Sequence, residues 1–159
     1  MSAVEQLEHV TGERFATMYE ALAQQGFGPL DAEVAKAMRF RPQAIRKLPM
    51  ERRARKAREI ILARKNAELA YEFLGAYLMK SSKELVTGFL DATGVPHEDG
   101  MIEDLSRLPD RATLDEAVRT LDEKHGAEDV TLYLALCAQQ WPEVEELADL
   151  WRKRLPATV

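Results

Sequence analysis

The side chains of His97, Glu98 and Asp99 form the cluster in this sequence whose residue types could do chemistry. Imidazole and carboxylate groups bind divalent metal ions and exchange protons with substrates. Their spacing, however, fits neither an EF-hand loop nor a zinc signature. The other interpretation is a solvated turn with a helix cap, and we favour it over the metal or acid–base site. We therefore predict no metal ion and no other cofactor, and we keep these three residues as a secondary candidate site.

Motifs for nucleophilic or phosphate chemistry are missing from the sequence. Cys137 lies in an apolar stretch, where a thiol usually behaves as a small hydrophobic group. None of the serines lies in a Gly-x-Ser-x-Gly motif, and no glycine-rich phosphate loop precedes a helix. His125 precedes Gly126 at an expected helix end, where a cation interacts favourably with the helix dipole. The sequence therefore predicts a protein that is not an enzyme.

Charge is segregated along the chain, although the net charge is only −5. Residues 39–65 carry 11 Lys and Arg against 2 Glu, whereas residues 91–150 carry 16 Asp and Glu against 4 Lys and Arg. Three interpretations remain open: independent solvated faces, two blocks that face each other within the fold or across a dimer, and a basic block that meets an external polyanion. The candidate residues for a partner or polyanion contact are Arg46, Arg52, Arg53, Arg55, Lys56 and Arg58.

Residues 30–48 resemble the helix-turn-helix pattern, in which two short helices pack through small and apolar side chains. Asp31 would cap the first helix and Pro42 would begin the second. The segment departs from the pattern at Arg39, where the turn usually has a glycine, so that arginine must adopt a left-handed conformation. The resemblance implies binding to duplex nucleic acid through this segment and the basic helix expected over 50–65.

We rank a protein partner or a second copy of the chain above nucleic acid. The basic segment has a single aromatic residue, Phe40, which argues against single-strand binding by base stacking. The acidic remainder of the chain repels nucleic acid at long range. We expect the cations of the basic helix to meet acidic side chains from 91–150, in the same or a second chain.

The composition predicts an all-α protein of about eight helices in a single domain, 1–159. Ala, Leu, Glu, Arg and Lys make up 82 of the 159 residues, which is typical of long helices. Prolines and glycines mark boundaries, and they leave one expected helix over 3–25 and either one helix over 50–80 or two that break near Asn66. Residues 130–138 are apolar on all sides apart from Thr131, which predicts a central helix.

An internal similarity suggests a repeat. At an offset of 44, residues 66–95 match 110–139 at six of thirty positions. Both segments would then be antiparallel helical hairpins, stacked as a short two-hairpin repeat within 66–155 and followed by a final helix. Residues 1–65 would pack against them or extend as a basic arm. Between the hairpins, we expect one short helix pinned by Met101, Ile102, Leu105 and Leu108.

The sequence also indicates where in the cell the protein is expected. One cysteine excludes a disulfide framework, and the first residues lack the basic flank and apolar run of a signal peptide. The longest uncharged run, from Val130 to Pro142, is too short to span a bilayer. We therefore expect a cytoplasmic protein with no membrane partner, a helical interaction module whose alternative function is association with nucleic acid.

Overall fold

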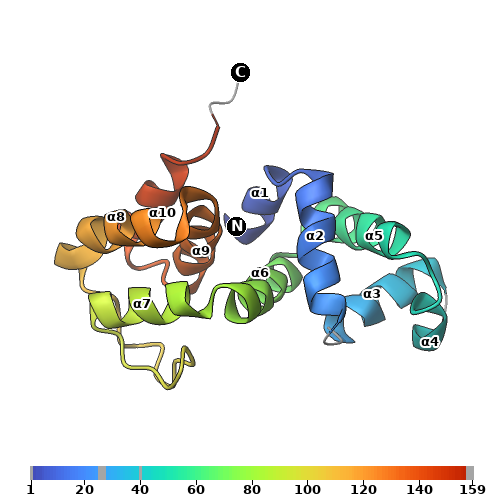
Figure 1. Cartoon of the computed structure of the whole chain (residues 1–159), viewed down its shortest axis with the longest axis horizontal. Helices are drawn as coiled ribbons and strands as arrows, with labels where there is room; N and C mark the ends of the chain where they lie inside the picture. Colours follow the sequence, from blue (N-terminus) through green and yellow to red (C-terminus); the bar gives the residue numbers. More distant parts are fainter. Residues whose placement is uncertain (1, 25–27, 40, 157–159) are drawn as a thin grey trace. The chain divides into compact units, whose positions relative to one another are not determined.

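The computed structural model describes residues 2–24, 28–39 and 41–156, and in these ranges the chain is all-helical (Figure 1). Nine α-helices have seven residues or more, one has four, and no strand forms within the same ranges. The prediction of an all-α fold with about eight helices is confirmed. In chain order the elements are α1 (Ser2–Glu8), α2 (Gly12–Ala23), α3 (Gly28–Met38), α4 (Pro42–Ile45), α5 (Met50–Ala63), α6 (Ala67–Ser81), α7 (Lys83–Thr93), the 3-10 helix η1 (Arg111–Thr113), α8 (Leu114–His125), α9 (Ala127–Gln140) and α10 (Glu145–Arg152).

The chain divides into two compact units, with the boundary inside α6. We call Ala3–Tyr77 unit 1 and Leu78–Val159 unit 2. The boundary lies twelve residues beyond the division that we expected between 65 and 66. The prediction of a single domain is not tested by this division and stays a prediction.

Unit 1 is built around α5, which packs against both α2 and α3. Helix α2 contributes Phe15, whose ring stacks on Phe73 of α6 with the ring centroids 4.7 Å apart. Helix α5 presents Ala54 and Ala57, and such small side chains let neighbouring helices approach closely.

The N-terminal helix that we expected over 3–25 is two helices, so that prediction is wrong. Helix α1 ends at Glu8, and α2 begins at Gly12. The Thr11 side chain accepts a hydrogen bond from the backbone N–H of Arg14 at 3.1 Å, which caps the start of α2. A threonine cap followed by glycine thus starts a new helix where hydrophobic spacing alone predicted continuity.

The basic helix ends before α6 begins, which confirms the two-helix alternative for 50–80. Lys65 has a left-handed backbone, with φ of 46°. The side-chain oxygen of Asn66 then accepts a hydrogen bond from the backbone N–H of Leu69 at 3.0 Å. An asparagine in this position satisfies a backbone donor that the first turn of a helix leaves free.

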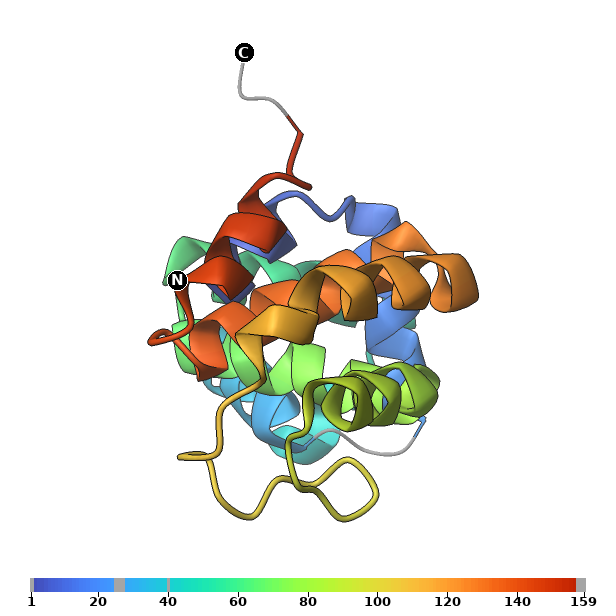
Figure 2. The ribbon, with the colours of Figure 1, turned by 90° about the vertical axis from the view of Figure 1, so that its left-hand side faces the viewer.

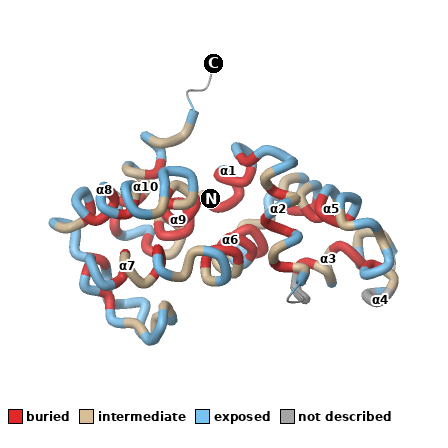
Figure 3. Tube along the Cα trace, in the orientation of Figure 1, coloured by how far each residue is buried: buried red, intermediate tan, exposed pale blue. Residues whose placement is uncertain are grey.

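Unit 2 is built around α9, which packs against α8 and α10, while α7 packs on α8 (Figure 2). The middle of helix α9 is buried, whereas its first three and last three residues are not (Figure 3). We expected Leu132, Leu134, Leu136 and Cys137 to be nearly inaccessible, and each is at most 7% exposed. The prediction of a central helix is therefore confirmed.

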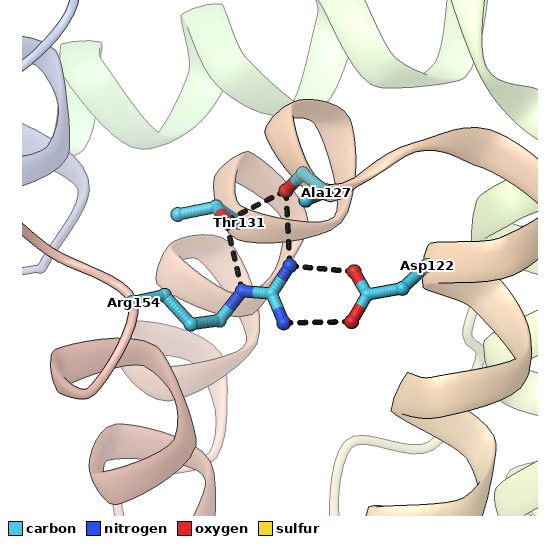
Figure 4. Close-up of polar contacts among 4 residues, drawn as sticks. All are labelled: Asp122, Ala127, Thr131 and Arg154. Atoms are coloured by element: carbon cyan, nitrogen blue, oxygen red, sulfur yellow. Dashed lines mark hydrogen bonds and ion pairs between the residues drawn. The ribbon is translucent and has the colours of Figure 1, made fainter.

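Arg154 fixes the segment after α10 to the corner between α8 and α9 (Figure 4). Its guanidinium group bonds both carboxylate oxygens of Asp122, at 2.9 and 2.5 Å. It also donates from Nε to the Thr131 hydroxyl and from Nη2 to the carbonyl of Ala127. Every guanidinium nitrogen is used, and such bidentate pairs give geometric specificity.

The expected two-hairpin repeat is not confirmed. Helices α8 and α9 pack as neighbours within unit 2, as the second hairpin requires. The first hairpin would join α6 and α7, but the boundary between the units falls within α6. The repeat stays a prediction.

The helix expected around Met101–Leu108 does not form. Instead, the Asp104 carboxylate accepts hydrogen bonds from the backbone N–H and the hydroxyl of Ser106, which makes a local turn. These two bonds hold the pKa of Asp104 below its ordinary value. Three of the four apolar side chains expected to pin a helix are left in solvent, with Met101 65% and Leu105 56% exposed, while Ile102 is half-buried.

None of the helices in the described ranges is both long enough and apolar enough to cross a membrane.

Candidate interaction surface

The secondary candidate site, His97-Glu98-Asp99, forms a tight turn. Asp99 and Gly100 both have positive φ, 54° and 91°, and Glu98 and Met101 exchange two backbone hydrogen bonds across them. This is the geometry that Asp-Gly favours in two-residue hairpin turns. The side chain of His97 takes part, because its Nδ1 accepts from the N–H of Gly100 at 2.9 Å.

The other contacts of this turn lead outward rather than to a common centre. Because Nδ1 of His97 accepts a hydrogen bond, Nε2 carries the hydrogen in the neutral ring and donates it to Asp91 at 2.7 Å. Asp99 instead pairs with Lys83. Across the residues described, no three His, Cys, Asp or Glu side chains are grouped so that they could hold a metal ion. The three candidates therefore fold a loop and fasten it to α7.

Cys137 is completely buried in α9. Burial raises the pKa of its thiol far above the ordinary value, and a hydrogen bond with Tyr133 offsets only part of that rise. A thiol in this state is neutral and out of reach of a substrate.

Among the six basic candidates, Arg53 is buried and serves the fold. It is 8% exposed and lies 3.6 Å from Asp31 of α3, with its guanidinium carbon 5.7 Å from the ring centre of Tyr19 of α2. The Tyr19 hydroxyl donates to the same aspartate at 2.5 Å. Burial, and then the bond to Asp31, raise the pKa of Tyr19 well above its ordinary value. Arg53 therefore joins three helices of unit 1 and is not available to a partner.

Three further ion pairs join α5, and the residue after it, to carboxylates of unit 1. The nitrogen–oxygen distances are 3.2 Å for Arg55–Glu51, 3.3 Å for Lys56–Glu59 and 3.8 Å for Arg64–Glu33. Arg58 donates instead to the backbone carbonyl of Val10 at 3.1 Å. Most cations of the basic helix are thus satisfied close to where they lie.

The acidic partners differ from those that we expected. Within one chain, the expectation of partners from 91–150 is wrong for Arg53, Arg55 and Lys56, whose carboxylates lie between residues 31 and 59. The reason is proximity, because acids one helical turn away, or on the packed helix α3, are reached first. Pairing with residues 91–150 of a second chain stays a prediction.

A group of exposed cations remains around α4, and we call it the basic corner. Its members lie at the end of α3, on either side of α4 and in the first turn of α5; they are Lys36, Arg39, Arg41, Arg46, Lys47 and Arg52. All six are exposed, and none makes an ion pair with another described residue. Residues 34–50 contain five of them and no acidic residue.

The acids that could neutralise the basic corner are already engaged. Between residues 28 and 63 there are four, and each is paired with a cation outside the corner: Asp31 with Arg53, Glu33 with Arg64, Glu51 with Arg55 and Glu59 with Lys56. The corner is therefore a concentration of positive charge that its surroundings do not offset.

Two of the six basic candidates named from the sequence, Arg46 and Arg52, belong to this corner. Lys36, Arg39, Arg41 and Lys47 were missed. The acid-free run over 34–50 could have indicated them. Counting charge over the wider block 39–65 hides that run, because the block includes Glu51 and Glu59.

The helix-turn-helix resemblance holds in part. Helices α3 and α4 pack together, and Arg39 has the left-handed backbone that we expected, with φ of 57°. However, α4 has only four residues, from Pro42 to Ile45. A helix of about one turn is short for an element that must present several side chains to base edges in a major groove.

The two units differ in net charge. Residues 3–77 carry 13 Lys and Arg against 10 Asp and Glu, a net of +3, and residues 78–159 carry 9 against 17, a net of −8. The acidic unit includes an exposed loop over 97–110, which we call the acidic loop. It carries five acids against one arginine: Glu98, Asp99, Glu103, Asp104 and Asp110 against Arg107.

Comparisons with protein-family models, curated proteins and solved structures give no match to this chain.

Proposed function

We propose that this chain is a non-enzymatic interaction module that binds an acidic protein surface through its basic corner. The observation that carries the proposal is the pairing pattern of unit 1. Four acids form ion pairs with cations of α5 or with Arg64 just after it. Six exposed cations within 36–52 are left without a carboxylate partner among the residues described. Like charges so close together repel one another, and an acidic partner would relieve that repulsion.

Arginine predominates in the corner, with four arginines and two lysines. Its planar guanidinium fork suits carboxylates and phosphates alike, so nucleic acid is the second candidate function. The packing of α3 on α4 favours it. The short α4 and the net charge of −8 on unit 2 favour the protein partner.

The test compares two variants that lose the same amount of charge. The corner variant carries Arg41→Gln, Arg46→Gln, Lys47→Gln and Arg52→Gln. The control variant carries Arg119→Gln, Lys124→Gln, Arg152→Gln and Lys153→Gln, four exposed cations of unit 2. Labelled poly-L-glutamate and a labelled short DNA duplex are the probes, and fluorescence anisotropy is the readout.

We expect poly-L-glutamate to bind the wild type and the control variant, and to lose at least tenfold in affinity for the corner variant. Melting temperatures should be alike, because all the replaced side chains are exposed. Tighter binding of the duplex that also depends on the corner, with a steep loss between about 50 and 200 mM salt, would replace the proposal with the nucleic-acid function. Equal binding of both variants to both probes would overturn each function.

A further inference from the structure

Three apolar side chains of the acidic loop are exposed although they lie in an ordered part of unit 2. Met101, Leu105 and Leu108 are 65%, 56% and 40% exposed, and no other large hydrophobic residue in the described part of the chain is exposed to this extent. A lone exposed leucine needs no explanation, but three within eight residues are typical of a contact surface.

The loop is held in place from both ends. Its turn is fastened to α7 through His97–Asp91 and Lys83–Asp99. At its other end, the N–H of Asp110 donates to the carbonyl of Thr93 at 2.9 Å. The exposed apolar side chains are therefore presented by a fixed backbone, which lowers the entropy cost of binding.

The chemistry of the acidic loop is complementary to that of the basic corner. The loop combines apolar side chains with five acids and one arginine. The corner combines six exposed cations with the half-buried side chains of Met38, Leu48 and Met50. The two surfaces thus carry opposite charge, and each also offers apolar side chains to the other.

From this match we infer that the acidic loop of one copy of the chain docks on the basic corner of a second copy. The inference rests on the proposed function, because it names the acidic partner of the corner. Every copy carries one loop and one corner, so two copies can satisfy each other twice around a twofold axis. One loop and one corner make a small, charged contact, so we expect weak association that depends on concentration and on salt.

Reciprocal charge reversal tests the inference in the full-length chain. Variant C carries Arg41→Glu and Lys47→Glu in the corner, and variant L carries Glu98→Lys and Glu103→Lys in the loop. Molar mass by light scattering or sedimentation is measured over a concentration series at low salt.

The wild type should approach twice the 18.0 kDa of one chain, or grow into longer chains if the contact does not close. Each variant alone should associate at least tenfold more weakly, because the net charge of the corner falls from +6 to +2 in C and that of the loop rises from −4 to zero in L. An equimolar mixture of C and L should associate more strongly than either variant alone, because the unchanged corner of L can then bind the unchanged loop of C. Failure of the mixture to associate would overturn the inference.

A second variant tests the apolar part of the contact. Met101→Ser with Leu105→Ser should weaken association at least tenfold and leave the melting temperature unchanged, because both side chains are more than half exposed. Unchanged association would also count against docking through this loop. A wild type that stays monomeric yet binds poly-L-glutamate through the corner removes the inference and leaves the proposed function standing. A wild type that neither associates with itself nor binds poly-L-glutamate would overturn both the inference and the proposed function.

Discussion

Helices α5 and α9 each have fourteen residues, and they differ in what they bury. Helix α9 buries seven of the eight consecutive residues 130–137, all except Thr131, and it forms the centre of unit 2. Helix α5 buries five, of which two are alanines and one is an arginine, and it leaves most of its charge in solvent. Helix α9 is stabilised mainly by the apolar area that it removes from water. Helix α5 is stabilised by the close approach of neighbouring helices to its alanines and by one buried polar cluster.

The largest effect of this difference should be on the reactivity of the cysteine in α9. Cys137 lies at the centre of α9, so a thiol reagent such as Ellman's reagent should reach it only when the helix opens. For a domain of ordinary stability, labelling should be slower than that of the unfolded chain by about three orders of magnitude or more. Rapid labelling without denaturant would show that α9 is not the closed core of unit 2.

The pH dependence follows from the same burial. Burial raises the pKa of Cys137, so the folded state favours the neutral thiol. Its contribution to stability is complete below the pKa of the unfolded thiol, about 8.5, and is lost as the pH rises above that value. The melting temperature should therefore fall faster above this pH for the wild type than for Cys137→Ala, each compared with its own value near neutrality.

Shortening a side chain of α9 should have the next largest effect. Leu134→Ala should lower the free energy of unfolding by about 2–5 kcal/mol, because it leaves a cavity in a closely packed core. Leu105→Ala is the matched control, since that side chain is 56% exposed, and its change should stay within about 0.5 kcal/mol. Equal effects of the two changes, measured by chemical denaturation, would contradict the central place of α9.

The two helices also differ in how far the sequence could predict them. An apolar run such as 130–138 has no polar face to offer to solvent, so its burial follows from composition alone. The charged run 50–63 has a narrow apolar side and cations on the rest of its surface, and the position of Arg53 against Asp31 depends on how α3 packs on α5. Sequence periodicity does not contain that tertiary contact.

The helix boundaries also show what sequence periodicity can and does not predict. The break at Asn66 could be predicted because the width of the apolar stripe changes there, and Asn66 caps α6. The break at Thr11 was missed because the apolar spacing continues through it, with Leu7 and Phe15 both buried. At Thr11 the hydrogen bond from the backbone N–H of Arg14 starts the new helix, and hydrophobic spacing contains no signal for such a cap.

The candidate surface could be found only in part for a related reason. Arg46 and Arg52 were named from charge density, but so were Arg53 and Arg58, which serve internal contacts. What distinguishes the basic corner is that neighbouring acids are already used, and the pairing of Glu33 with Arg64 depends on the packing of α3 beside α5.

Within α5, the buried arginine should matter more than its exposed neighbour. Arg53→Ala should cost about 1–3 kcal/mol, because it leaves the largely buried Asp31 without its cation. Arg52→Ala, one residue away and exposed, should stay within about 0.5 kcal/mol. A double-mutant cycle with Asp31→Ala should show that the two residues are coupled. Additive effects would mean that the ion pair contributes nothing and that Arg53 acts through packing alone.

The exposed pair on the same helix should give the smallest effect. Arg55 and Glu51 are one turn apart, with side chains 72% and 83% exposed, and solvent screens most of their attraction. Arg55→Gln should therefore change the free energy of unfolding by about 0.2–0.5 kcal/mol at low salt, and by less as salt is added. Denaturation of Arg55→Gln, Glu51→Gln and the double variant at two salt concentrations measures the difference. An effect as large as that of Arg53→Ala would show that the outer face of α5 is packed against protein in solution, as when a second copy covers it, because solvent could then no longer screen the pair.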